Sequence, residues 1–142
     1  MNLNTDFVNK LRSSGLRPTK QRLKICEILF NTEKTFHFTI NDLSKIISEK
    51  LNEKISLATV YNTVHAFKNK GYLKEISINS DKSYFDTNTL VHHHFFDEDT
   101  NELIDCNEND IDSINVKNNI TGKKINSVEV LIKVASDNQN QN

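Results

Sequence analysis

Apolar positions in the first part of the chain recur at helical spacing between turn signals, which predicts four helices. Residues 5–14 form the first helix, which ends at Gly15. The second begins at Pro18, because proline fits the first helical turn, where its missing N–H is not needed. The third begins at Thr39, with Asp42 three residues later in an arrangement similar to a capping box.

The fourth helix, which Ser56 can cap, has the most informative pattern. Its apolar stripe consists of Leu57, Val60, Val64 and Phe67. Its opposite face is small, polar and free of acids, and consists of Ala58, Thr59, Asn62 and Ala66, with Tyr61 at its edge. Such a face suits close approach to base edges and thymine methyl groups in a DNA groove. An ordinary amphipathic surface helix shows the same stripe, so the stripe alone does not decide between the two.

Beyond Gly71 the apolar period shortens to two, which predicts strands. Residues 72–78 and 83–86 form a hairpin around a polar turn at 79–82. Helices followed by such a hairpin predict a winged helix-turn-helix, whose recognition helix would be the fourth helix, placed in the major groove.

The C-terminal part predicts a small α/β unit after a polar connection. Its expected elements are strands at 92–97 and 102–106, a helix at 107–119 and a strand at 125–134. A unit of this size is marginal alone, and pairing with a second copy would bury its sheet. The fold class is therefore α+β, with a winged-helix domain at 1–87, an α/β dimerisation and regulatory domain at 88–135 and a disordered tail at 136–142.

Composition indicates a globular protein of the cytoplasm, with no membrane partner. Of the 142 residues, 36% are hydrophobic and 26% charged, and no apolar run approaches the roughly 20 residues that span a bilayer. The first residues lack the apolar core of a signal peptide. Cys26 and Cys106 lie far apart, which predicts neither a disulfide framework nor a cysteine metal site.

Charge divides the chain into a basic and an acidic half. Residues 1–75 contain 13 Lys and Arg against 7 Asp and Glu, whereas residues 76–142 contain 5 against 12. The basic half is the candidate for contact with phosphate. Arg17, Lys20 and Arg22 cluster near the start of the second helix, where the helix dipole also favours an anion.

Three consecutive histidines are the main candidate for ligand chemistry. In a strand, His92 and His94 point to one face and His93 to the other. Imidazole binds zinc, manganese, ferrous iron and haem iron. His37 stands alone between two phenylalanines, and by itself that position is more typical of a structural residue.

Several segments resemble the ferric uptake regulator (Fur) family in order and spacing: GLRPTKQRLKI, HFTINDL, ISLATVYNTVHAFKNKGYL, KSYFD and VHHHFF. The resemblance covers nearly the whole chain, and YFDTN, HHHFF and ELID look most like the iron response regulator (Irr) branch. It implies a DNA-binding winged-helix domain, a dimerisation domain and a homodimer on A·T-rich inverted repeats of double-stranded promoter DNA.

The resemblance also implies ligands for a regulatory metal site. His37 matches a ligand from the DNA-binding domain, Asp86 matches a Glu at the end of the wing, and His93 matches a ligand in the hinge strand. His92 matches a ligand of a neighbouring site, whereas His94 falls where an Asp is usual.

The CxxC pairs that hold a structural zinc in most Fur proteins are absent from this chain. Glu98 and Asn101 occupy the place of the first pair, so we expect no structural zinc.

For DNA, the resemblance implies that Arg17 enters the minor groove and that Thr59, Tyr61 and Asn62 face the major groove. Lys20 and Arg22 would contact phosphate or serve the fold.

The resemblance to the Irr branch implies a transcriptional regulator of iron and haem homeostasis, not an enzyme. It also implies that haem binds at the His cluster and removes the protein from DNA. The alternative is a Fur-type repressor with Fe²⁺ or Mn²⁺ as corepressor, and Zn²⁺ is a further candidate ion. A metal-dependent enzyme would need an open metal position and a general base, and the sequence shows no such arrangement. A metal-storage module is a further alternative.

Overall fold

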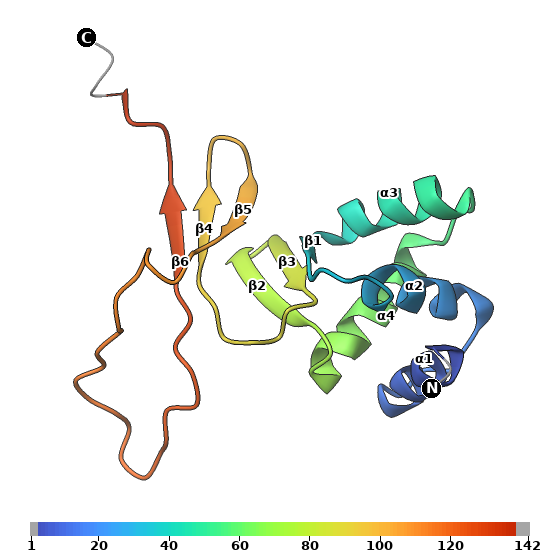
Figure 1. Cartoon of the computed structure of the whole chain (residues 1–142), viewed down its shortest axis with the longest axis horizontal. Coiled ribbons are helices and arrows are strands. Elements are labelled where there is room, and N and C mark those ends of the chain that lie inside the picture. Colours follow the sequence, from blue (N-terminus) through green and yellow to red (C-terminus); the bar gives the residue numbers. More distant parts are fainter. Residues whose placement is uncertain (1–2, 139–142) are drawn as a thin grey trace. The chain divides into compact units, whose positions relative to one another are not determined.

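The structure, a computed structural model, describes residues 3–138 (Figure 1). These residues form two compact units that divide after Thr89. The first unit is mainly helical with a small sheet, and the second is a small sheet with a long irregular segment. The chain therefore has the α+β fold class that the sequence predicts.

Four helices of the first unit lie close to their predicted positions: α1 (Leu3–Ser13), α2 (Lys20–Phe30), α3 (Ile40–Leu51) and α4 (Leu57–Lys70). Thr39 and Asp42 form the predicted capping box at the start of α3. The Ser56 side chain caps α4 by accepting a hydrogen bond from the Thr59 N–H. Gly71 ends α4 with a φ of 94°, a left-handed conformation that favours glycine.

The start of α2 differs slightly from the prediction. Thr19 is its N-cap and accepts a hydrogen bond from the Arg22 N–H, so Pro18 precedes the cap instead of lying in the first turn. A hydroxyl that satisfies an otherwise unpaired N–H decides where the helix begins.

The sheet of the first unit contains β1 (His37–Phe38), β2 (Lys74–Asn79) and β3 (Lys82–Asp86), in the antiparallel order β1-β3-β2. β2 and β3 form the predicted hairpin after α4, which gives the arrangement of helices and hairpin expected for a winged helix-turn-helix. β1 was not predicted, because two residues are too few to show a periodic pattern. It places His37 opposite Asp86 and Phe38 opposite Phe85.

The core of the first unit joins all four helices to the sheet. Its fully buried side chains include Leu11, Ile25, Leu29, Phe38, Leu43, Ile47, Val60, Val64, Phe67 and Phe85. Each such side chain stabilises the fold by about 1.5–3 kcal/mol relative to exposure. The predicted stripe of α4 is wrong at one position, because Leu57 in the first turn is 52% exposed while Thr63 is buried. The Thr63 hydroxyl donates to the Thr59 carbonyl, which makes its burial tolerable.

The second unit contains a three-stranded sheet of β4 (His94–Asp97), β5 (Glu102–Asp105) and β6 (Leu131–Val134), in the order β5-β4-β6. β4 pairs antiparallel with β5 and parallel with β6. The turn between β4 and β5 is fixed by Asp97, whose carboxylate accepts from the Asp99 and Thr100 N–H groups. This is the hairpin that the sequence predicts, except that its first strand begins at His94 and not at His92.

The helix predicted at 107–119 is wrong. The structure has no regular element from residue 107 to 130, a segment drawn in orange in Figure 1. Most of its side chains are exposed, so Ile111 and Ile114 do not anchor an apolar face there. Asn and Asp are frequent in this segment and favour turns over helix interiors, which accounts for the outcome.

The last predicted strand is shorter than expected, since only Leu131–Val134 pairs with β4. In the predicted disordered tail, the N–H and hydroxyl of Ser136 donate to the Asp99 carboxylate. The end of that tail, residues 139–142, lies outside the described residues. Among residues 3–138, no helix combines the length and the hydropathy needed to cross a bilayer.

Candidate metal ligands and nucleic-acid interface

In the first unit, two candidate ligands face each other across neighbouring strands. His37 on β1 lies opposite Asp86 on β3, and a ring nitrogen of one lies within 4.8 Å of a carboxylate oxygen of the other. Asp86 is only 2% exposed, and its carboxylate accepts from the Asn88 N–H. A carboxylate this deeply buried requires hydrogen bonds or a positive partner, and a metal ion is one such partner.

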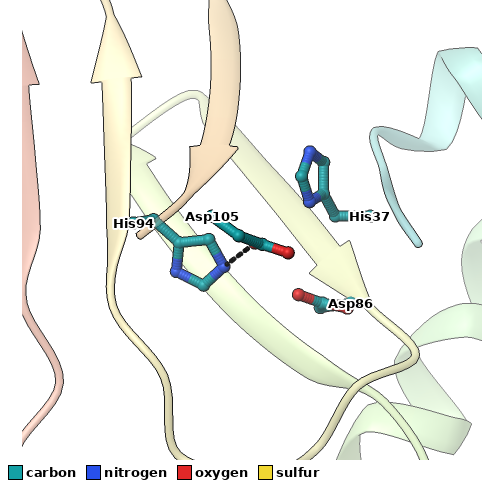
Figure 2. Close-up of side chains that lie close together, drawn as sticks. All are labelled: His37, Asp86, His94 and Asp105. Atoms are coloured by element: carbon teal, nitrogen blue, oxygen red, sulfur yellow. Dashed lines mark ion pairs between the residues drawn. The ribbon is translucent and has the colours of Figure 1, made fainter. Parts of the chain in front are cut away.

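In the second unit, a histidine and an aspartate also face each other across a strand pair. His94 on β4 is opposite Asp105 on β5, and its Nε2 lies 3.1 Å from the Asp105 Oδ1, as the dashed line in Figure 2 shows. His94 is 4% exposed. The side chain of Asp105 was not among the predicted ligands, and the hairpin register is the signal that identifies it.

His92, two residues before β4 begins, lies beside this pair. Its ring centroid lies 4.3 Å from that of His94, and its Nε2 is 3.7 Å from the Asp105 Oδ1. Its Nδ1 is 2.7 Å from the Leu90 carbonyl oxygen, which orients the ring as outer-shell partners orient metal-ligating histidines.

His93, which also precedes β4, has a different environment. Its Nδ1 accepts a hydrogen bond of 2.9 Å from the Val130 N–H, which fastens the residue before β6. It also lines a cavity of about 460 Å³ together with Cys106 and Asp112. Within the second unit, the structure therefore brings together His92, His94 and Asp105 but not His93.

The donor set of these residues fits a borderline divalent cation. It comprises imidazole nitrogens and carboxylate oxygens, the ligand types that bind Fe²⁺, Mn²⁺ and Zn²⁺. The sulfur ligands that would favour a softer ion do not contribute. Cys26 is buried in the helical core, where burial raises the pKa of its thiol to about 12. Burial, together with the carboxylates of Asp110 and Asp105, also raises the pKa of Cys106.

The outer face of α4 is open to solvent where the sequence predicts DNA contact. Tyr61 is 51% exposed, and Asn62 is exposed beside it. Thr59 is half-buried, and its hydroxyl lies 2.9 Å from the Ser56 Oγ, which donates to it. Thr59 is thus held at the start of the helix, whereas Tyr61 and Asn62 project from it.

The basic cluster before α2 divides into exposed and structural members. Arg17 and Lys20 are exposed. The Arg22 Nη1 donates a hydrogen bond of 3.0 Å to the Arg17 carbonyl. Arg22 therefore stabilises the backbone at Arg17, whose side chain is exposed.

A family model described as "Ferric uptake regulator family" matches residues 13–134. The peroxide operon regulator of Bacillus subtilis is 32% identical over 121 residues, which are 84% of this chain and 81% of that protein. The peroxide-responsive repressor PerR of Staphylococcus epidermidis is 32% identical over 109 residues, 77% of this chain and 71% of the relative.

Solved structures share the fold. The ferric uptake regulator of Vibrio cholerae has a TM-score of 0.68 at 22% identity, covering 91% of this chain and 98% of that one. The ferric uptake regulator of Pseudomonas aeruginosa with manganese has a TM-score of 0.64 at 21% identity, covering 92% and 97%.

Proposed function

The chain belongs to the ferric uptake regulator family of metal-responsive transcriptional regulators, and from this premise we propose that it is a repressor activated by a divalent metal ion. DNA would be read by Thr59, Tyr61 and Asn62, with Arg17 in the minor groove and Lys20 on phosphate. Arg22 would support Arg17. A chromosomal target would require the protein to be in the cytoplasm.

The observation that carries the proposal is a histidine paired with an aspartate in each unit. His37 and Asp86 form one pair, and His94 and Asp105 form the other, with His92 beside it. One pair offers two donors, whereas Fe²⁺, Mn²⁺ and Zn²⁺ bind four or more. An ion at either pair would therefore need further donors, and His92 supplies one beside the second pair.

Haem control of iron homeostasis, as in the Irr branch, is the second candidate. The neighbouring rings of His92 and His94 favour it. However, His94 is buried and already close to a carboxylate, which suits a small cation better than an axial ligand to a porphyrin. The relatives named above are peroxide regulators and not iron response regulators.

The names of these relatives support a peroxide signal for this chain. Bound Fe²⁺ would supply the electrons that reduce peroxide. Mn²⁺ gives up electrons to peroxide far less readily. If so, peroxide should release DNA from the Fe²⁺-loaded protein but not from the Mn²⁺-loaded protein. A Cys106→Ser variant should respond like the wild type, and loss of its response would assign the signal to the thiol instead.

Titration of DNA binding with Mn²⁺ and with haem separates the two candidates. The Mn²⁺-loaded protein would first select its duplex from random sequences, and the binding of that selected duplex would then be measured. The proposal predicts that Mn²⁺ strengthens binding and that haem has no effect at equal concentration. Release by haem, with no response to Mn²⁺, would support the haem account and contradict ours.

A further inference from the structure

An aromatic stack connects the recognition helix to the strands that carry the first candidate ligand pair. The ring of Tyr61 lies on that of His65, one helical turn later, with centroids 4.1 Å apart. The His65 ring also packs against Phe85 in a T-shaped contact, with centroids 5.3 Å apart and an interplanar angle of 76°. His65 thus lies between an exposed aromatic residue and the core.

Phe85 has little freedom to move independently of the candidate ligands. It precedes Asp86 on β3 and lies opposite Phe38, which follows His37 on β1. The Phe38 and Phe85 rings stack with centroids 6.2 Å apart, and both side chains are fully buried. Because close-packed interiors transmit displacement instead of absorbing it, the position of Phe85 follows that of the strand pair.

Tyr61 would be poorly ordered without a supporting neighbour. It is half exposed on the face of α4 that is proposed to meet DNA bases. A mobile side chain loses conformational freedom when it binds, and this loss weakens binding. The contact with the His65 ring, tilted at 36°, removes part of that freedom before DNA arrives, since paired aromatic rings attract each other.

We propose that His65 is a positioning residue that holds Tyr61 in place for contact with bases. Through its contact with Phe85, His65 also connects Tyr61 to the strands that carry His37 and Asp86. The inference rests on the proposed function, because it concerns how the same protein reads DNA. It adds a residue that neither the apolar stripe nor the polar face of α4 identified.

The test is a double-mutant cycle between Tyr61 and His65. Binding of the selected duplex with Mn²⁺ present would be compared for the wild type, His65→Ala, Tyr61→Ala and the double variant. We expect His65→Ala to weaken binding about threefold to tenfold in the wild type and to have little effect in the Tyr61→Ala background.

Two further variants separate positioning from folding. His65→Phe keeps a ring beneath Tyr61 and should restore near wild-type affinity. Asn69→Ala changes an exposed residue on the same helix and should leave affinity unchanged. A scrambled duplex should be bound equally by the wild type and His65→Ala, because phosphate contacts do not involve Tyr61.

Two results overturn the inference. Equal losses from His65→Ala in the presence and absence of Tyr61 would show that the two residues act independently. Loss of affinity for both duplexes together with a lower melting temperature would show that His65 serves only the fold. Failure of the proposed function gives a different result, because the wild type would then select no duplex at all. Failure of the inference alone leaves a duplex that the wild type binds.

Discussion

At the residue scale, each candidate ligand is positioned by its partner across a strand pair. Asp86 is opposite His37, and Asp105 is opposite His94. In each pair the backbone ladder sets the separation of the two side chains, so the donors are preorganised before an ion binds. The acidic partner contributes as much to this geometry as the histidine.

Replacement of Asp105 by Asn should lower Mn²⁺ affinity by at least about tenfold, since even outer-shell partners change metal affinity by that much. Glu102→Gln removes an exposed carboxylate from the same strand and serves as the matched control. Calorimetric titration of each variant with Mn²⁺ measures the effect. Equal affinities for Asp105→Asn and Glu102→Gln would remove Asp105 from the site.

Cys26 should be chemically inert in the folded protein. It is fully buried, and burial raises the pKa of its thiol to about 12, so the reactive thiolate is scarce at neutral pH. In a Cys106→Ser variant, a thiol reagent at pH 7.5 should therefore label the protein only after denaturant is added. Rapid labelling of this variant without denaturant would show that the core opens readily.

At the element scale, the β2–β3 hairpin is linked to α4 by Glu75. The Ser83 hydroxyl donates a hydrogen bond of 2.7 Å to its carboxylate, and the Lys68 ammonium lies 3.3 Å away. The hydrogen bond from Ser83, followed by the interaction with Lys68, lowers the pKa of Glu75 below its ordinary value of 4.5. One carboxylate therefore links β2, β3 and α4.

Glu75→Gln should reduce the free energy of unfolding by about 1 kcal/mol at neutral pH, the usual scale for such a contact. Because the pKa is lowered by folding, the wild-type advantage is complete above pH 4.5 and is lost as pH falls through the folded-state pKa. Denaturation at pH 7 and in acid measures this change. Ser80→Ala, at the exposed hairpin turn, is the control. A difference that grows in acid would contradict the assignment.

Elements with local signals could be predicted from the sequence. The capping box at Thr39, the Ser56 cap and the glycine after α4 are each encoded within a few residues, and each is present in the structure. The wing hairpin likewise follows from its alternation and its turn. These features depend on neighbours in the sequence, which a reading of the chain can evaluate.

Features that depend on distant partners could not be predicted. β1 exists because Phe36 and Thr87 exchange hydrogen bonds across 51 residues. Asp105 was missed for a different reason, because its place opposite His94 follows from the register of the predicted β4–β5 hairpin, which the ligand prediction did not use. The helix at 107–119 was predicted from two isoleucines. The prediction failed because the Asn and Asp residues of this segment favour turns over a helix. The sequence therefore predicted only part of the candidate site, because it identified the histidines and Asp86 but missed Asp105.

At the scale of the whole molecule, a small second unit has little core of its own. Its buried apolar residues among those described are Phe96 and Leu103, whereas Ile114, Val116 and Ile120 are exposed. Apolar side chains left exposed on so small a unit favour association with a second copy.

We expect sedimentation equilibrium to give twice the chain mass of 16.4 kDa. The dimer should persist in EDTA, because the chain has no CxxC pair to hold a structural zinc. Dissociation by EDTA, reversed by Zn²⁺, would show that a metal ion maintains the dimer after all.

The central claim is that a divalent ion, held by the histidine–aspartate pairs, strengthens DNA binding. The most direct measurement is the affinity for the selected duplex as free Mn²⁺ rises, for the wild type, His37→Ala and His94→Ala. We predict that Mn²⁺ raises wild-type affinity about tenfold or more, a coupling of roughly 1.4 kcal/mol, and that each variant loses this response but keeps its metal-free affinity. A wild type indifferent to Mn²⁺, or a variant that responds as fully as the wild type, would contradict the claim.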